Sequence, residues 1–278
     1  MSLPRHDAAI YLTPLREGGS LPAVVEATDG SLWVVKFRGA GQGPRALIAE
    51  VLVAELAEAV GLPVPDRAVV ELDASFGLGE RDPEIRDVLK ASRGVNIGLR
   101  YMDGAFNLDP VAVPESVDET FATTLVWFDA MVSNPDRSAR NPNLMLWQGR
   151  TWLIDHGAAL YFHHDWTRVT PERMRAPLPT IQDHILLSRS GDLEAADQEL
   201  ANRVTPSVLD QAVARIPEEL LIDPLVTEPN SGGADAWRQR YRDALTARLE
   251  EPRAFARDAE SRRRTAASSP PSRLESRR

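Results

Sequence analysis

The chain has 278 residues and contains no cysteine. Disulfide frameworks, thiolate zinc sites, iron–sulfur clusters and cysteine nucleophiles are therefore excluded. The sequence also lacks any apolar run of the roughly 18 residues that a membrane helix needs. Its N-terminus does not show the basic and then apolar pattern of a signal peptide. These absences predict a soluble, cytoplasmic protein without a membrane span.

An excess of positive charge is also missing. The formal net charge is −9, whereas a protein that binds a phosphate backbone needs a basic surface, so a nucleic-acid partner is excluded. Lysine is scarce as well, because Lys36 and Lys90 are the two lysines among 32 basic residues. Where arginine is the rule, each lysine is a candidate for a position that requires a primary amine.

The first part of the chain predicts a small antiparallel sheet and one helix. Asp29-Gly30 is a turn typical of two-residue hairpins. Pro44 begins an apolar helix that ends at Gly61. The predicted strands cover residues 23–28, 31–37, 67–72 and 96–102.

The second part is mostly helical and contains one more tight hairpin, with its turn at Gln148-Gly149. Helices are predicted over residues 119–132, 193–204, 206–215 and 235–249. From Glu251 on, the sequence has few large apolar residues and many arginines, which predicts a disordered tail. We therefore expect an N-terminal unit over residues 1–102, a C-terminal unit over 103–250 and a tail over 251–278.

Three polar residues lie close together around this second hairpin. Asp136 and Asn141 are five residues apart in the loop before it, and Asp155 follows its second strand. Counting outward from the turn places Asn141 and Asp155 together at the open end. Carboxylate and amide oxygens suit Mg²⁺, with water and phosphate completing its ligands. Asp136, in the same loop, is placed to accept a proton from an attacking hydroxyl group.

This constellation resembles the catalytic core of the protein-kinase-like fold. The resemblance implies that Asp136 is the catalytic aspartate and that Asn141 and Asp155 are metal ligands. The sequence departs from eukaryotic protein kinases in two places. Asn134-Pro135 stands where they have His-Arg, and His156 stands where they have Phe.

The same resemblance assigns roles to the first part of the chain. Lys36 lies on a strand like the one that carries the ATP-binding lysine of kinases, and Val34 lies on the same strand face, where it would cover an adenine. The following helix supplies a carboxylate that pairs with Lys36. We favour Glu50 for this pairing, with Glu55 and Glu58 as the alternatives.

Two further segments complete the expected nucleotide site. Gly18, Gly19 and Ser20 precede the first hairpin, and adjacent glycines with a hydroxyl group can bring backbone N–H groups close to phosphate. In the kinase-like fold, the strand that reaches Tyr101 and Met102 leads into the hinge, whose backbone would bind the adenine edge.

Within this fold, residues 18–65 and 134–162 resemble the HipA-like kinases, in particular a short bacterial single-chain branch. The resemblance implies an α+β, two-lobed protein-kinase-like fold with a small antiparallel-sheet lobe and a mostly helical lobe. It implies an ATP- and Mg²⁺-dependent kinase that phosphorylates a hydroxyl of a protein or of itself. The alternatives are a catalytically inactive nucleotide-binding scaffold and a small-molecule kinase.

Three other polar positions receive structural interpretations. Adjacent histidines on a strand point to opposite faces, so His163 and His164 are expected at the surface or in a loop and not on a shared metal ion. Asp129, within an apolar helix, is expected to accept backbone N–H bonds from the catalytic loop. His156 is expected to pack behind Asp155 or to orient it by a hydrogen bond.

Overall fold

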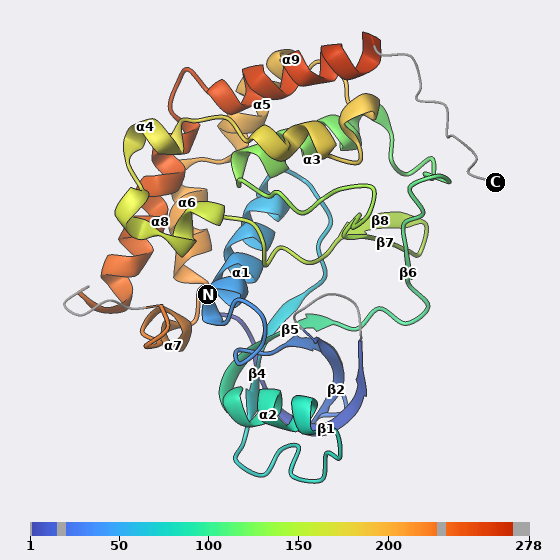
Figure 1. Cartoon of the computed structure of the whole chain (residues 1–278), viewed down its shortest axis with the longest axis vertical. Coiled ribbons are helices and arrows are strands. Elements are labelled where there is room, and N and C mark those ends of the chain that lie inside the picture. Colours follow the sequence, from blue (N-terminus) through green and yellow to red (C-terminus); the bar gives the residue numbers. More distant parts are fainter. Residues whose placement is uncertain (1, 16–20, 227–231, 269–278) are drawn as a thin grey trace.

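A closed β-barrel and a larger helical part make up the residues that this computed structural model describes, which are 2–15, 21–226 and 232–268 (Figure 1). The barrel strands are rich in Val, Ala and Leu, and their order is β1-β2-β3-β5-β4. Their bounds are β1 (Arg5–Pro14), β2 (Ala23–Ala27), β3 (Leu32–Lys36), β4 (Arg67–Leu72) and β5 (Gly94–Arg100).

The barrel corrects the predicted antiparallel sheet in one respect. Strand β1 runs parallel to β4, with Arg5 opposite Val69, and thereby closes the barrel, while the other neighbouring strands pair antiparallel. The sequence analysis missed β1 because most of its side chains are exposed, so its apolar residues do not form a clear pattern.

Strand β3 presents different residues to its two faces, as its period of two predicted. Trp33 and Val35 belong to the barrel core. Leu32 and Val34 are half-buried on the opposite face, and Lys36 lies on that face at the end of the strand. This arrangement places Lys36 outside the barrel, toward helix α1.

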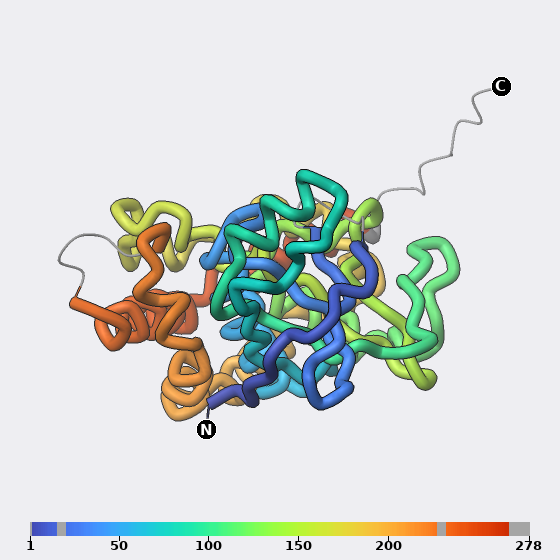
Figure 2. Tube along the Cα trace, turned by 90° about the horizontal axis from the view of Figure 1, so that it is seen from below, coloured from blue at the N-terminus to red at the C-terminus, as the bar shows by residue number. Residues whose placement is uncertain are grey.

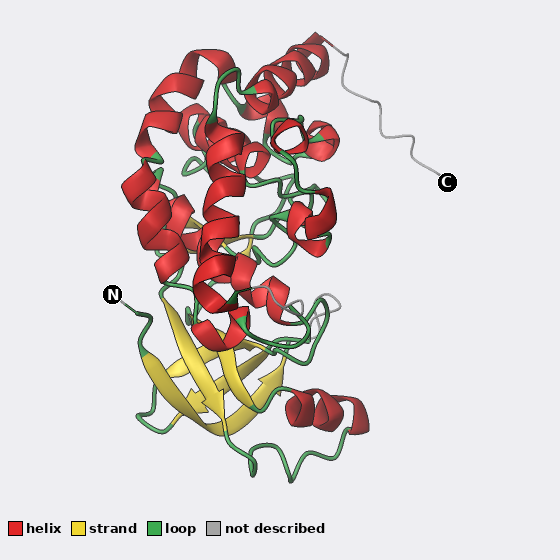
Figure 3. Ribbon diagram, turned by 90° about the vertical axis from the view of Figure 1, so that its left-hand side faces the viewer, coloured by secondary structure: helices red, strands yellow, loops and turns green. Residues whose placement is uncertain are grey.

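The helical part contains most of the apolar core. Helix α1 is buried almost all round because it packs against α6 and α7 as well as the barrel strand β5, which explains its lack of a polar face. Figure 3 shows the barrel at one end of the molecule and the helices stacked beyond it. The helices are α1 (Pro44–Ala59), α2 (Pro83–Ala91), α3 (Glu119–Met131), α4 (Pro171–Met174), α5 (Leu193–Arg203), α6 (Pro206–Ala214), α7 (Glu218–Leu221), α8 (Gly233–Leu249) and α9 (Ala254–Ser268).

A second, three-stranded sheet lies beside the helices. Its order is β6 (Phe106–Asn107), β7 (Leu144–Trp147) and β8 (Arg150–Leu153), and all of its pairs are antiparallel. The chain between β5 and α3 runs out to one side of the molecule to reach this sheet (Figure 2). Among the described residues, no helix combines the length and apolar composition that a membrane span requires.

The predicted disordered tail is wrong for residues 254–268, which form helix α9. Phe255, Ala256 and Ala259 recur at helical spacing and are buried, and α9 packs against α3 and α5. The prediction weighed the scarcity of large apolar residues, yet two alanines and one phenylalanine are enough to cover one helix face. The division of the chain at residue 102 stays a prediction.

If α9 is part of the folded core, Phe255→Ala should destabilise the protein. The Phe255 ring lies 5.6 Å from the Trp127 ring, and Arg248 lies 5.0 Å from the Phe255 centroid. We expect a loss of about 3–5 kcal/mol in the free energy of unfolding, measured by urea denaturation, because the substitution leaves a cavity. The control Arg257→Ala changes an exposed residue of the same helix. An equally small effect of both variants would contradict the conclusion that α9 is part of the folded core.

The anchoring of α9 should also depend on pH through Glu260. Hydrogen bonds from Arg263, from the Leu193 amide and from Arg264 lower the pKa of this buried carboxyl to about 2. Its contribution to stability is therefore complete above its usual pKa of 4.5 and disappears as the pH falls toward 2.

Glu260→Gln should accordingly cost about 2 kcal/mol of unfolding free energy at pH 7, and the cost should shrink steadily below pH 4.5. Asp258→Asn makes the same charge change at a less buried position of α9 and serves as the control. A cost for Glu260→Gln that does not change between pH 7 and pH 3 would contradict this account.

Candidate active site

Three charged residues from distant segments meet in one place. Lys36 ends β3, Glu50 lies on α1 and Asp155 follows β8. The Lys36 Nζ donates to Asp155 Oδ1 at 2.6 Å and forms a buried ion pair with Glu50. Lys36 is 7% exposed and Glu50 is fully buried, whereas the Asp155 side chain is 41% exposed. The structure thus confirms that Lys36 pairs with a carboxylate on the following helix.

The choice among the three candidate glutamates is also confirmed. Glu50 is the partner of Lys36, while Glu55 and Glu58 both bind Arg67 on β4. The sequence could not decide between them because α1 is apolar on nearly every side.

Electrostatics keep the Lys36 amine charged. Burial alone would lower its pKa, but the Glu50 and Asp155 carboxylates outweigh that effect and raise the pKa. Burial would raise the pKa of Asp155, yet Lys36 lowers it. Burial raises the pKa of Glu50, and Lys36 opposes this rise. One cation therefore faces two carboxylates.

The turn after β8 brings Asp155 close to α1. Asp155 has a φ of 56°, in the left-handed region. Gly157 follows, and a Cβ atom at this position would lie 3.4 Å from both the Ala46 Cβ and Glu50 Oε1. A small residue at 157 allows the turn to approach the first turns of α1.

The β7–β8 hairpin has the predicted register, with Trp147 opposite Arg150. The pairing continues past the strands, because the Ile154 amide donates to the Asn143 carbonyl at 3.1 Å. Asn141 and Asp155 therefore both lie just beyond the open end of this hairpin. Asn141 is exposed.

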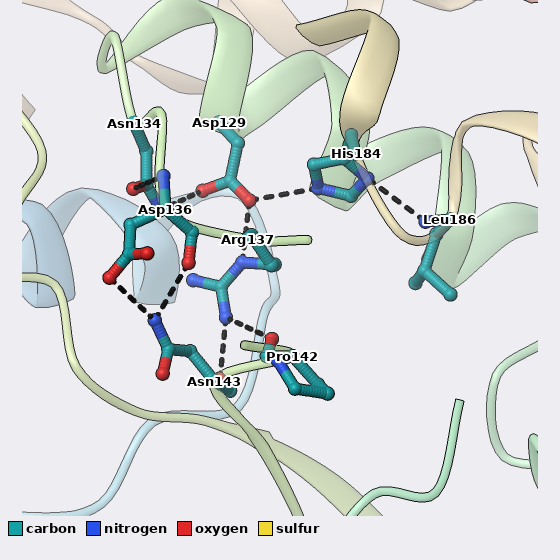
Figure 4. A network of polar contacts seen from close by, with 8 residues as sticks. All are labelled: Asp129, Asn134, Asp136, Arg137, Pro142, Asn143, His184 and Leu186. Carbon is teal, nitrogen blue, oxygen red and sulfur yellow. Dashed lines mark hydrogen bonds and ion pairs between the residues drawn. The ribbon is translucent and has the colours of Figure 1, made fainter. Parts of the chain in front are cut away.

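Hydrogen bonds with three asparagines orient Asp136, and Figure 4 draws those with Asn134 and Asn143. Asn141 Nδ2 donates to Asp136 Oδ2 at 2.9 Å, and Asn143 Nδ2 donates to the Asp136 carbonyl at 2.8 Å. The Asp136 amide in turn donates to Asn134 Oδ1 at 3.1 Å. Because Asn141 uses its amide nitrogen here, its Oδ1 stays available as an acceptor.

Beneath this loop, Asp129 is fully buried and accepts three side-chain hydrogen bonds (Figure 4). The donors are Arg137 Nε at 2.5 Å, Asn134 Nδ2 at 2.9 Å and His184 Nε2 at 3.0 Å. Burial would raise the pKa of Asp129, but Arg137 and then His184 outweigh it and hold the pKa well below its usual value. The expectation that Asp129 accepts backbone N–H bonds is corrected, since these donors are side chains.

Arg137 and His184, which both bind Asp129, also form hydrogen bonds with neighbouring segments. Arg137 Nη1 donates to the Asn143 carbonyl at 2.5 Å and thus ties the end of the loop to Asp129. The His184 Nδ1 accepts from the Leu186 amide at 3.1 Å, which leaves its Nε2 as the donor to Asp129. Sequence analysis missed His184 because it is 55 residues away from Asp129 and belongs to no motif.

The other histidines take structural positions. His156 is buried behind Asp155, and neither ring nitrogen has a hydrogen-bond partner within the described ranges. Burial lowers its pKa to about 3, so the ring is neutral and packs without orienting Asp155. The expected surface position of His163 is wrong, because it lies in a 3₁₀ turn, is buried and contacts the Tyr241 hydroxyl at 3.1 Å.

The expected adenine-binding residues lie on β3 and directly after β5. Val34 is half-buried on the outer face of β3 and pairs with Leu99 of β5. Tyr101 and Met102 come directly after β5, and the Tyr101 amide donates to the Leu32 carbonyl at 3.0 Å. Their contact with a nucleotide stays a prediction. The expected phosphate-binding residues Gly18, Gly19 and Ser20 lie outside the described residues.

The donor chemistry around Asp155 fits a hard divalent cation. Asp155 offers its second carboxylate oxygen, and Asn141 offers Oδ1. Within the described part of the chain no cluster of three or more His, Cys, Asp or Glu side chains could hold a metal by itself. A cation here would need oxygen atoms from phosphate or water as further ligands, which is typical of Mg²⁺ sites.

Comparisons with solved structures show the fold. The crystal structure of a Helicobacter pylori proinflammatory kinase, CtkA, matches with a TM-score of 0.54 at 11% identity, covering 94% of this chain and 99% of that chain. A Golgi casein kinase with Mn/ADP bound gives a TM-score of 0.42 at 11% identity, with 90% and 73% coverage. Another structure of Golgi casein kinase gives 0.40 at 11% identity, with 89% and 71% coverage. The likeness to the Helicobacter kinase shows a shared kinase-like fold.

Comparisons of sequence identify the family. No curated protein matches the chain significantly. A family model described as HipA-like kinase matches residues 11–231, which include the whole constellation around Lys36. The prediction of a phosphotransferase is thereby confirmed at the level of the family. This chain belongs to the family of HipA-like kinases.

Proposed function

We propose that this protein transfers the γ-phosphoryl group of ATP, with Mg²⁺, to a hydroxyl group of a protein, including its own. The observation that carries the proposal is the meeting of Lys36 with both Glu50 and Asp155. Phosphoryl transfer depends mainly on positioning and on neutralising phosphate charge, and a buried cation held by two carboxylates supplies a fixed charge for this purpose.

Nucleotide binding follows from the placement of the surrounding residues. Lys36 would hold phosphate oxygens through its amine, and Glu50 would keep that amine in place. Val34 would cover one face of the adenine, while the backbone of Tyr101 and Met102 would bind its edge. We also propose that Gly18, Gly19 and Ser20 contact the phosphates through backbone N–H groups.

Asn141 and Asp155 are the proposed metal ligands. Both offer oxygen atoms, and the excess of one negative charge around Lys36 favours a further cation. Mg²⁺ bound there would neutralise negative charge on the phosphate oxygens. Asn141 and Asp155 would thereby help to hold the triphosphate in line with the acceptor.

Asp136 is the proposed catalytic aspartate. Its carboxylate is held by the Asn141 amide, so it can accept a hydrogen bond from an acceptor hydroxyl and then take its proton. The acceptor oxygen forms a bond to the γ-phosphorus as the bond to the leaving ADP oxygen breaks. The Asp129 anchorage fixes the loop that carries Asp136, so this geometry is set before substrate binds.

Asp155→Ala should abolish most Mg²⁺-dependent ATP turnover. The variant removes a proposed metal ligand and one partner of Lys36, and we expect kcat to fall about 10²–10³-fold with little change in Tm. Asp165→Ala, at an exposed carboxylate of the following segment, is the matched control. Undiminished turnover by Asp155→Ala would contradict the assignment.

Transfer to a protein can be separated from the alternatives with γ-labelled ATP. The protein is incubated with the nucleotide alone, with large molecules from a host lysate, and with its small molecules. The proposal expects label in a protein band, including its own. Label in small molecules alone would favour a small-molecule kinase, and thermal stabilisation by Mg·ATP without transfer would favour an inactive scaffold.

Asn143→Asp should test the support of the catalytic loop. Asn143 has a φ of 49°, which aspartate also tolerates, but aspartate cannot donate to the Asp136 carbonyl. We expect kcat to fall about tenfold or more at an unchanged KM for ATP, because the proposed contacts with the adenine lie on β3 and after β5 and not in this loop. Asn202→Asp makes the same change at an exposed position. Equal kinetics for both variants would show that this bond is dispensable.

A further inference from the structure

The C-terminal end of helix α1 is bound to the neighbouring helices by side-chain contacts. Glu55 Oε1 accepts from Arg67 Nη2 of β4 at 2.8 Å and from Arg215 Nε at 3.0 Å. Arg215 ends helix α6, which packs along α1 (Figure 1). Glu55, on the same helix as Glu50, therefore binds one arginine from the barrel and one from the end of α6.

A second arginine binds the end of α1. Arg203, the last residue of α5, donates from Nη1 to the carbonyl of Val60 at 2.9 Å. Val60 is the C-cap of α1, and the last turn of α1 contains no basic residue of its own. A cation at this position satisfies a free carbonyl and opposes the negative end of the helix dipole.

Two more ion pairs join the barrel side to α7 and to the chain that follows it. Arg5 of β1 binds Glu71 of β4 and, at 2.5 Å, Glu219 of α7. Arg38, in the loop between β3 and α1, lies 3.4 Å from Asp223. These contacts limit movement of the barrel relative to α7 as well.

We propose that Arg203 and Arg215 are positioning residues, which hold α1 where Glu50 pairs with Lys36. This inference rests on the proposed function. Glu50 lies five positions before Glu55 on a buried helix, so a shift of the helix end moves both carboxylates together. The pairing of Lys36 is therefore set by contacts between α1 and the helices α5 and α6, and it needs no further ordering event.

The test uses the full chain with Arg203→Ala and Arg215→Ala combined. We expect kcat for Mg²⁺-dependent ATP turnover to fall about tenfold. Amide hydrogen exchange within residues 47–57 should become about tenfold faster, because α1 opens locally more often. Arg242→Ala is the matched control, since Arg242 binds Asp210 between α6 and α8 and does not bind α1.

Two further variants separate positioning from general stability. Arg215→Lys keeps a cation near Glu55, so this single variant should retain most of the wild-type turnover. In a Glu50→Gln background, the two arginine substitutions should have no additional effect on kcat, because their effect acts through Glu50.

The proposal is overturned if α1 exchanges at the wild-type rate in the double variant. If the wild type is active, the proposal is equally overturned when the double variant matches Arg242→Ala in kcat, or when the arginine substitutions lower kcat as strongly in the Glu50→Gln background as in the wild type. Hydrogen exchange needs no catalysis, so this result stands even for a protein without turnover. If the wild type shows no turnover but α1 still exchanges faster in the double variant than in the wild type, the proposed function is refuted and the anchoring of α1 by Arg203 and Arg215 still holds.

Discussion

The ion pairs of the Lys36 amine hold the candidate site together. Its two partners, Glu50 and Asp155, come from a helix and from a hairpin more than a hundred residues further along the chain. Removing charges from water is costly, and the attraction between them offsets this cost when the geometry is close. Each carboxylate therefore ties its own element, α1 or the turn after β8, to the end of β3.

Two polar clusters keep the elements around this point in register. Asp129, with Arg137 and His184, anchors the loop that carries the proposed catalytic aspartate. The arginine bridges to Glu55 and to the end of α1 hold the helix that carries Glu50. The Asp129 cluster is buried, so the loss of one partner there leaves an uncompensated charge in the interior. In the arginine bridges, Arg215 is half-buried and Arg203 is exposed.

The sequence predicted those parts of the fold that local chemistry specifies. The position of the first hairpin and the register of the β7–β8 hairpin follow from short patterns of turn residues and apolar spacing, although the first loop holds three residues, 28–30, and not the predicted two. The pairing of Lys36 followed from the resemblance to kinases. It did not predict β1, His184 or helix α9. Each of these depends on contacts with distant segments, and a mostly exposed strand or a helix with small apolar residues carries no strong pattern of its own.

The scarcity of lysine offers the most direct test of the account. An acyl phosphate derived from ATP acylates amines that lie against the bound phosphates, and the chain holds two lysines, Lys36 and the exposed Lys90. Mass spectrometry should find the label on Lys36, and excess Mg·ATP should prevent it, with Lys90 as the internal control. Labelling of Lys36 that Mg·ATP does not reduce, or equal labelling of both lysines, would contradict the claim that Lys36 faces the nucleotide.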